Sequence, residues 1–468
     1  MISRTTPLIG FAIAALAVLG QAATAAGPRT HAEMGQRAWD RHILETPEML
    51  PGLVEFRTDT EAMRAFYSGT LFPDFGYGGI NDDAAEYAHW HPYQQVYLEY
   101  LLERFPPPWD AAARREIAFF FGILCHGVGD VPWHFDEDGH KSLLTMAREE
   151  DNSGHGFTEH ITDIFSHVLF DLEPDVRGNF VWLTRTAQTV FERAGIAVTA
   201  EELKRGCRKL EAEWMRGARL GPIVYPYFQA KIPWCRAHFE DYYYGGVDHG
   251  AALTAMCIRY YYAQLRGWHY YQNIPIQASA FPRGDPFTPC VDAVIADDGE
   301  METGYLAVGR GAHALLRFDL SNLPPSYAVE HATLWLRRTG EPVSRPMSVT
   351  CHEITHPWCP VEADWHTAGP EDAAWPVPGA EGAYTPSPFA LNRVTAESSE
   401  WLAWDVTGLV RHWVSGRRPN YGVLLKVDSR TETATHLPLR FYSSAAQQAR
   451  PDGYGGTAVE YRPVLVVR

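Results

Sequence analysis

The apolar residues of this chain repeat with two different periods, and the change of period divides the sequence. From residue 31 to about residue 272 they recur at three- and four-residue steps, which is typical of amphipathic helices. Beyond residue 290, short runs alternate between apolar and polar residues, which is typical of half-buried strands. The stretch from Gln272 to Cys290 keeps neither period and has prolines at 275, 282, 286 and 289, so it predicts a linker.

Each half contains several well-marked runs. The helical half predicts helices at Pro92–Phe105, Ala111–Gly127, Phe157–Leu172, Val181–Ala194, Ala200–Ala218 and Glu240–Trp268. The alternating half predicts strands at Ala314–Leu320, Ala332–Arg338, Met347–Ile354, Trp401–Val406, Gly422–Val427, Leu439–Ser443 and Val464–Val467. Between two of these strands, His366 to Glu400 is rich in Pro, Gly and Ala and is expected to form a long loop.

The length of 468 residues, with 46% hydrophobic content, exceeds what one core usually supports. We therefore expect a multidomain protein, with an all-α domain followed by an all-β sandwich. The expected division is a signal peptide at 1–25, a helical domain at 26–272, a linker at 273–289 and a β-sandwich at 290–468.

The first residues have the pattern of an export signal. Arg4 supplies a basic start, Pro7 to Gly20 is an apolar run too short to span a bilayer, and Ala23 to Ala25 has the A-x-A form of a cleavage site. Cleavage there would begin the mature chain at Ala26 and place the protein outside the cell, in the periplasm or at the cell surface. An uncut membrane anchor is the alternative, and no other stretch is long and apolar enough to cross a membrane.

Metal-type side chains recur at four-residue steps in the helical half. His126, Asp130 and His134 form one set, and His155 with Glu159 forms a second. Residues four apart share one face of a helix, and imidazole with carboxylate suits zinc. Pro132 is expected to kink the first helix, because it lacks an N–H and disfavours helical geometry at the preceding residue. The plain alternative is two surface ion pairs, one on each helix.

Further candidate ligands lie outside these helices. Asp74 follows a proline and precedes glycines on an expected turn, and His89 lies in AHWHPY; each could reach a helical cluster. The new α-amino group and carbonyl oxygen of Ala26 would form a chelate five residues before His31. Taken alone, Asp74 could be a solvated turn residue, His89 a partly buried one and His31 an ordinary residue at a helix start.

The net charge argues against two kinds of binding partner, and the cysteine content argues against a fold held by disulfides. The net charge of −17, without any Lys/Arg run, argues against broad electrostatic capture of nucleic acid or anionic membrane. Seven cysteines in a chain of this length do not form a disulfide scaffold, although Cys351 and Cys359 could pair.

Several motifs together resemble the zinc-dependent phospholipase C family, and within it the glycosylphosphatidylinositol-specific phospholipase D branch. They span roughly residues 29 to 270 and read THAEMGQRAW, SGTLFPDFGY, AHWHPY, GILCHGVGDVPWH, SGHGFTE and FEDYYYGGVDHGA. The resemblance implies an all-helical fold that holds three zinc ions. It implies one zinc held by Asp74, His89, His126 and Asp130, a second by His134, His155 and Glu159, and a third by Ala26, His31 and the bridging Asp130.

The activity implied is hydrolysis of a phosphodiester, with Asp74 as the acceptor of a proton from the attacking water. Zinc lowers the pKa of bound water and favours an anionic substrate. The substrate expected is a phospholipid or a glycosylated phosphoinositide, and whether the bond broken is that of a phospholipase C or D stays open. A single-strand nuclease on the same fold is the second candidate, although no basic and aromatic groove is apparent. The third is a cell-surface glycan-binding protein whose zinc is structural.

The C-terminal half resembles the DNRLRE domain over about residues 290 to 468. The motifs are ALLRFDLSNLP, ATLWLRR, WDVTGLVRHWVSG, NYGVLLK, RFYSS and RPVLVV. This resemblance implies a module of a secreted protein, with a glycan or cell-wall ligand as its partner. Trp335, Trp404 and Trp413 stand in alternating strands and are expected in its core rather than as sugar platforms.

Overall fold

The structure is a computed structural model that describes most of the chain from Gly27 onward. It describes residues 27–468 except 46, 137–140, 152–154, 172–177, 243–244, 272–289, 298–303, 310, 322, 361, 370–372, 432–437, 445–446, 450–454 and 458–460. The expected signal peptide, Ala26 and the expected linker 273–289 lie outside the described residues.

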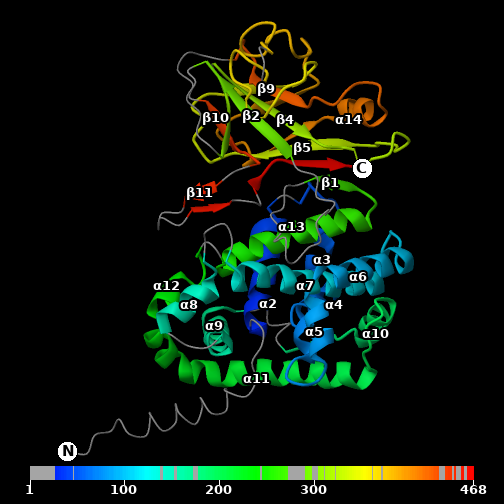
Figure 1. Cartoon of the computed structure of the whole chain (residues 1–468), viewed down its shortest axis with the longest axis vertical. Helices are drawn as coiled ribbons and strands as arrows, with labels where there is room; N and C mark the ends of the chain where they lie inside the picture. Colours follow the sequence, from blue (N-terminus) through cyan, green and yellow to red (C-terminus); the bar gives the residue numbers. More distant parts are fainter. Residues whose placement is uncertain are drawn as a thin grey trace, which may run out of the picture. The chain divides into compact units, whose positions relative to one another are not determined.

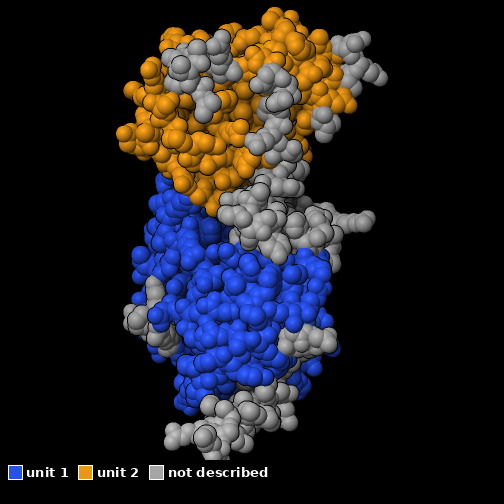
Figure 2. All heavy atoms as spheres, turned by 90° about the vertical axis from the view of Figure 1, so that its left-hand side faces the viewer, with its two compact units in different colours: residues 1–266, 276–283 blue, residues 267–275, 284–468 orange. Residues whose placement is uncertain are grey.

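The chain divides into two compact units (Figure 2). One contains Met1–Arg266 and Ile276–Arg283, and the other contains Gly267–Pro275 and Gly284–Arg468. The regular elements described between Gly27 and Arg266 are all helices, and this unit is called the helical unit below. The second is rich in strands and is called the β unit. The sequence prediction of a helical region followed by a strand-rich region is confirmed.

The helical unit is built around α7, which runs from Ala111 to His134 (Figure 1). Every residue of α7 from Ile117 to Trp133 is buried, as expected of a central helix that is apolar on all sides. The other helical elements are α2 Pro28–Arg37, η1 Ala38–Ile43, α3 Val54–Thr58, α4 Thr60–Gly69, η2 Phe72–Gly76, α5 Asp82–His89, α6 His91–Arg104, α8 Leu143–Asp151, α9 His155–Leu169, α10 Thr184–Arg193, α11 Ala200–Lys231, α12 Pro233–His238 and α13 Val247–Leu265.

Glycines allow α4 and α7 to lie in close contact. A Cβ atom at Gly69 would lie 2.1 Å from the carbonyl oxygen of Phe119, and one at Gly122 would lie 2.1 Å from the carbonyl oxygen of Phe66. Only hydrogen fits at either position. The contact brings the C-terminal end of α4 beside the middle of α7, where His126 lies.

Two helices extend well past the ends that the sequence predicted for them. We expected Pro132 to kink α7, but the helix continues through it to His134. Pro132 lies in the last turn, so its missing N–H removes one helical bond near the end, and Phe135 N–H still donates to Val131 O at 3.0 Å. Similarly, α11 extends past Ala218 to Lys231 with Pro222 and Pro226 inside it. No helix in the described part of the chain is long and apolar enough to cross a membrane.

The β unit contains two larger sheets, and all their neighbouring strands are antiparallel. Their orders are β2-β4-β9-β6-β7 and β1-β13-β5-β8, and two further pairs are β10-β3 and β11-β12. The strands are β1 His269–Tyr271, β2 Cys290–Ala296, β3 Tyr305–Val308, β4 Ala312–Phe318, β5 Ala332–Arg337, β6 Met347–Glu353, β7 Ala390–Val394, β8 Trp401–Asp405, β9 Val423–Val427, β10 Leu439–Tyr442, β11 Gln447–Ala449, β12 Gly455–Thr457 and β13 Val464–Val467.

One apolar core joins residues of both larger sheets. Leu316, Val349 and Leu425 come from the five-stranded sheet, and Leu334 and Trp404 come from the four-stranded sheet. The unit is not made of strands alone, because α14 (Thr407–Val414) follows β8. Residues 269–271 were expected in the helical domain, but they pair with β13 as part of the β unit.

The structure also tests what we expected of the cysteines and of three tryptophans in the β unit. All seven cysteines are free thiols, so Cys351 and Cys359 do not form the disulfide that the sequence allowed. Trp335 and Trp404 are buried in strands, as expected, whereas Trp413, which was also expected in a strand, lies on α14 and is partly buried against the core.

Candidate metal centre

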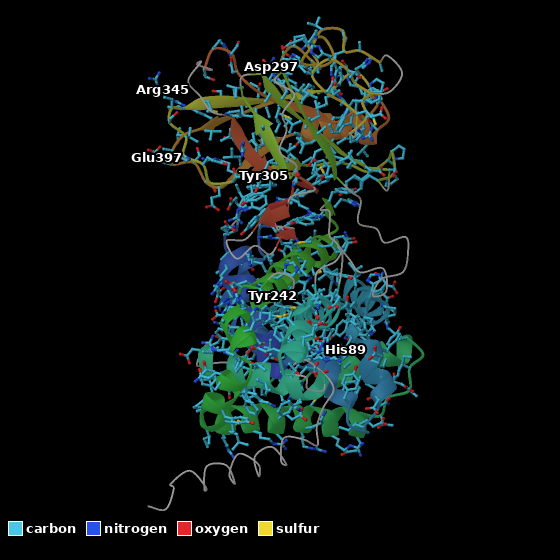
Figure 3. All side chains as sticks on the ribbon, turned by 60° about the vertical axis from the view of Figure 1, so that its left-hand side comes forward. His89, Tyr242, Asp297, Tyr305, Arg345 and Glu397 are labelled. Carbon is cyan, nitrogen blue, oxygen red and sulfur yellow. The ribbon has the colours of Figure 1, made fainter. Side chains whose placement is uncertain are left out.

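Five of the candidate ligands converge in the interior of the helical unit. His31 comes from α2, Asp74 from η2, His89 from α5, and His126 and Asp130 from α7. All five are at most 5% exposed. Figure 3 shows His89 among the helices of this unit. Two overlapping groups, His31–His126–Asp130 and Asp74–His89–His126, each bring their ligand atoms within 4.8 Å of one another.

The Nε2 atoms of His89 and His126 lie 3.0 Å apart. In each ring the other nitrogen is held by the backbone: His89 Nδ1 lies 2.7 Å from Ala85 O, and His126 Nδ1 lies 2.7 Å from Thr70 O. A carbonyl oxygen can only accept, so both Nδ1 atoms must carry the proton. In the neutral rings the two Nε2 lone pairs would then face each other, which a shared cation or an added proton would relieve.

Asp130 lies at the centre of the cluster and contacts imidazoles from three helices. Its Oδ1 lies 3.1 Å from His31 Nε2 and 3.3 Å from His134 Nε2, and its Oδ2 lies 3.4 Å from His126 Nε2 and 3.6 Å from His89 Nε2. A carboxylate with rings gathered at both oxygens has the geometry of a ligand that bridges two cations.

Asp74 is a second carboxylate beside His89 and His126. Its Oδ1 lies 3.2 Å from His89 Nε2 and 3.6 Å from His126 Nε2. The short helix η2, which begins at Phe72 and includes Pro73, turns this carboxyl inward, where it is 5% exposed. The expected turn aspartate is therefore buried and does not face solvent.

A further pair extends the cluster. His134 Nε2 lies 3.2 Å from Glu159 Oε1, and Glu159 comes from α9. Because α7 continues through Pro132, His126, Asp130 and His134 share one helix at four-residue steps. His155 is the first residue of α9, but its side chain lies outside the described part of the structure, as does the whole of Ala26.

Burial and mutual contact shift the pKa values of these groups in opposite directions. Burial lowers the pKa of His31, and the nearby His126 adds to this effect. Burial also opposes the charged form of His126, but the Asp74 and Asp130 carboxylates raise its pKa to about 10. Burial alone would raise the pKa of Asp74, yet His126 and His89 bring it down to about 2. Without a metal, the cluster therefore needs a positive charge among its rings.

The donor set fits a divalent cation that prefers nitrogen and oxygen. Among the described residues, the buried His31 Nδ1 has no hydrogen-bond partner, and the buried His31 Nε2, Asp74 Oδ1 and Asp130 Oδ1 lie near other ligand atoms of the cluster without forming a hydrogen bond. Buried polar atoms are normally paired, so unpaired ones concentrated in one place point to a missing partner. Imidazole nitrogens with carboxylate oxygens are ligands that zinc takes.

The sequence did not reveal the groups that orient these ligands. Thr70 O and Ala85 O are backbone acceptors, and a sequence carries no signal for them. Asp163 lies four residues after Glu159 on α9, and its Oδ1 accepts from Arg29 N at 2.8 Å and Thr30 N at 3.1 Å. It thereby caps α2, which carries His31. The four-residue repeat from His155 through Glu159 to Asp163 was the signal that could have found it.

Comparison with known families points to the same chemistry. Residues 30–220 match the model of a family described as zinc dependent phospholipase C. These residues contain every described member of the cluster. The resemblance that the motifs indicated is thereby confirmed for the helical unit, and that of the C-terminal half to DNRLRE domains stays a prediction.

Individual relatives carry a related name. The chain is 26% identical over 250 residues to a phosphatidylinositol-glycan-specific phospholipase D of Dictyostelium discoideum, covering 52% of this chain and 25% of that protein. It is 29% identical over 237 residues to the human protein of that name and 27% identical over 233 residues to the rat one, each time covering 47% of this chain and 27% of the relative. The similarity thus spans about a quarter of these relatives.

Proposed function

Because residues 30–220 carry the resemblance to the zinc-dependent phospholipase C family, we propose that the chain is a zinc-dependent phosphodiesterase that hydrolyses phospholipid or glycosylphosphatidylinositol-type phosphodiesters. One observation carries the proposal more than any other. The Nε2 atoms of His89 and His126 face each other at 3.0 Å beside two buried carboxylates, and a cation is the simplest group that satisfies all four.

We assign three zinc ions to the cluster, with the ligands that the motifs imply. The first set is Asp74, His89, His126 and Asp130; the second is His134, His155 and Glu159; the third is Ala26, His31 and Asp130. The contacts of Asp130 with both His31 and His126 support its bridging role. When bound, zinc would supply positive charge for the phosphate and an ionisable water for attack on phosphorus.

Asp74 is our candidate proton acceptor. Its pKa of about 2 keeps the carboxylate ionised at neutral pH, and its Oδ1 faces the imidazoles of His89 and His126 at 3.2 and 3.6 Å. A water placed beside this oxygen would lose its proton to Asp74 as it attacks phosphorus, and the proton would pass from the carboxylate to the leaving oxygen.

Two features favour this activity over the alternatives. A nuclease needs a positive groove for a polyanion, whereas the chain has a net charge of −17. A purely structural zinc would be closed by four protein ligands. The second ligand set, His134, His155 and Glu159, has three protein ligands and leaves a fourth position for water, as in a catalytic site.

A substrate panel tests the proposal. The mature chain, loaded with zinc, would be given phosphatidylcholine, phosphatidylinositol, a glycosylphosphatidylinositol-anchored protein and single-stranded DNA. We expect cleavage of a lipid phosphodiester, loss of this activity with a chelator and recovery with zinc. Release of diacylglycerol would identify a phospholipase C bond choice, and phosphatidic acid would identify a phospholipase D. Cleavage of DNA alone would replace the proposal with the nuclease.

We also propose that the protein is exported, with its signal peptide removed, and that the two larger sheets of the β unit form a sandwich. The pattern of residues 1–25 supports export. The apolar core that joins Val349 and Leu334, from different sheets, supports the sandwich.

For the β unit we propose a carbohydrate ligand. A polar hollow of about 360 Å³ is lined by residues that include His352, Glu381, Tyr384 and Lys426. Lys426 Nζ lies 2.5 Å from Glu381 Oε1 and 2.6 Å from Tyr384 Oη, so the charges there are already paired. A neutral ligand with many hydroxyl groups suits such paired donors and acceptors beside an aromatic ring.

A further inference from the structure

The C-terminal half of α11 presents a band of apolar side chains to solvent. Met215 is 43% exposed, Ile223 61% and Tyr227 47%. Three smaller exposed residues, Ala218, Pro222 and Pro226, belong to the same face of the helix. We call these six residues the α11 band. Of the six exposed large apolar residues described in the helical unit (Leu44, Leu102, Phe135, Met215, Ile223 and Tyr227), three lie in this band.

The opposite face of α11 is fixed to the elements that carry the metal cluster. Phe228 packs against Phe157 of α9, with ring centroids 5.9 Å apart. A Cβ atom at Gly217 would lie 2.2 Å from His167 Nε2, also on α9, and one at Gly206 would lie 2.3 Å from Phe75 O of η2. Helix α9 carries Glu159 and η2 carries Asp74, so the helix that bears the band packs directly on two elements of the cluster. Figure 1 shows α11 along one side of the helical unit.

The charge of this segment is opposite to that of the whole chain. Residues 214–239 contain Arg216, Arg219, Lys231 and Arg236 but no Asp or Glu, although the net charge of the chain is −17. Aromatic rings hold two of these cations: Lys231 Nζ lies 4.4 Å from the Phe157 ring centroid, and Arg236 donates to Tyr225 Oη at 2.6 Å. The nearby Glu150 of α8 accepts from Trp234 N and Cys235 N, so its charge is engaged at the start of α12.

A helix face of apolar residues that also carries the exposed Arg219, with further cations and aromatic rings beside it, is the pattern of a helix that lies in a bilayer interface. A soluble monomer rarely exposes such a band without a partner. The absence of acidic residues favours an anionic lipid surface over a protein partner, whose core contacts would not need flanking cations.

We propose that the α11 band docks the helical unit on an anionic phospholipid bilayer and so brings the chain to the surface that holds its proposed lipid substrate. The proposal rests on the proposed function for its purpose, but the binding itself requires no catalysis. Ile223 and Tyr227 would enter the headgroup region, while Arg219 and Lys231 would face lipid phosphates.

Vesicle co-sedimentation of the full mature chain tests the proposal. Vesicles of phosphatidylcholine alone and of phosphatidylcholine with 30% phosphatidylserine, about the anionic fraction needed for a strong surface charge, would be compared at low and high salt. We expect binding to the anionic vesicles, weakened by salt. The double variant Ile223→Asp with Tyr227→Asp should lower the partition coefficient about 10-fold or more, because two apolar anchors are lost.

Leu102→Asp on α6 is the matched control, since Leu102 is 44% exposed and lies outside the band. It should bind as the unaltered chain does, and thermal unfolding should show that both variants are folded. Equal partition of the double variant and the unaltered chain would overturn the proposal. So would a dimer that the double variant dissolves, with no binding to vesicles, because the band would then be an interface between two copies.

A soluble short-chain phosphodiester separates docking from catalysis. We expect the double variant to keep its turnover of the monomeric substrate while losing turnover on vesicles. If the chain binds vesicles through the band but cleaves neither substrate, the proposed function fails and docking stands. If it cleaves both substrates equally well in both forms, docking fails and the proposed function stands.

Discussion

His89 and His126 approach each other through their Nε2 atoms at 3.0 Å, with both Nδ1 atoms occupied by backbone carbonyl oxygens. The backbone thus fixes the tautomer of both rings and aims both lone pairs at one point. Fixing the outer nitrogen is the usual means by which proteins orient a metal-binding histidine. Asp74 and Asp130 supply the negative charge that such a point needs if a divalent cation is to lie there.

Replacing His126 should abolish the proposed hydrolysis without unfolding the chain. His126→Ala removes a ligand shared by both groups of the cluster, and loss of even an orienting residue lowers metal affinity or activity about 10- to 100-fold, so the loss here should be at least that large. Steady-state hydrolysis and circular dichroism would measure the two effects.

His42→Ala provides the control, because His42 lies in η1 outside the cluster. It should keep full activity. Unchanged turnover in His126→Ala would remove the cluster from the mechanism.

Asp163 should stabilise the helical unit by holding the start of α2. Asp163→Ala leaves the Arg29 and Thr30 N–H groups without their acceptor, which should cost about 1–3 kcal/mol of unfolding free energy. Asp163→Asn keeps one acceptor oxygen and should lose less. Gly27→Ala should also destabilise, because its Cβ atom would lie 2.0 Å from Asp163 Cβ. Urea unfolding would give these values.

A cap on another helix separates stability from metal binding. Asp110→Ala removes the cap of α7, where Asp110 accepts from Ala113 N at 2.8 Å. It should lower stability as Asp163→Ala does but keep its zinc content, whereas Asp163→Ala should also lose zinc because α2 carries His31. Equal zinc contents in the two variants would contradict a positioning role for Asp163.

A free α-amino group at Ala26 should increase the number of zinc ions that the chain holds. A tag fused ahead of Ala26 would block the proposed chelate of its α-amino group. We expect the tagged chain to hold fewer zinc ions than the chain that begins at Ala26, as measured by elemental analysis after gel filtration. Identical stoichiometry in both forms would refute the chelate and leave the remaining ligand sets untouched.

Asp292 should make the stability of the β unit depend on pH. Burial raises its pKa to about 6, whereas in the unfolded chain the value is that of an ordinary aspartate. Between about pH 4 and pH 6 the folded state therefore holds more protons, and the free energy of unfolding should fall as pH rises through this range. Well above pH 6 Asp292 is ionised in both the folded and the unfolded state, so its contribution to the free energy of unfolding no longer changes with pH.

Asp292→Asn should remove this slope and raise stability above pH 6 by about 2 kcal/mol, allowing for partial solvent screening. The amide oxygen can still accept from Ser444 N, which now donates to Asp292 Oδ2 at 2.6 Å. Calorimetric scans of both proteins from pH 4 to pH 7 would give the difference at each pH. A constant difference would show that Asp292 titrates normally.

The hollow of the β unit should lose its ligand when its aromatic wall is removed. Tyr384→Ala takes away the ring beside His352 and the hydroxyl that donates to Glu381 at 2.5 Å. Binding to a glycan array should weaken, whereas Tyr327→Ala, a tyrosine of the same unit outside the hollow, should bind as before. Equal binding by both variants would place any saccharide site elsewhere.

Much of the site could be predicted from sequence, since regular spacing carries information. His126, Asp130 and His134 repeat every four residues, which places them on one face of α7. The approach of Asp74, His89 and His31 depends on packing between distant helices, so their residue types made it possible and the resemblance to a known family implied it. The acceptors Thr70 O and Ala85 O could not be predicted, because any residue offers the same backbone oxygen.

The fold could be predicted where the apolar residues keep one period, and less well where that period ends. We expected Pro132 to bend α7, but its place in the last turn leaves little helix to disturb. The sequence prediction missed β2, which follows the proline-rich stretch, and α14, which lies among strands of alternating pattern. It also missed β7, because Ala390–Val394 was expected to belong to the long loop from His366 to Glu400. Asp163 escaped notice because its partners are backbone N–H groups of a helix 133 and 134 residues away.

Anomalous scattering at the zinc edge from crystals of the mature chain would test the central claim most directly. The proposed function predicts a zinc peak about 2.0–2.1 Å from the Nε2 atoms of both His89 and His126, with further peaks within reach of Asp130. Density that leaves those two nitrogens about 3.0 Å apart, with no metal beside them in protein purified and crystallised with zinc, would contradict it.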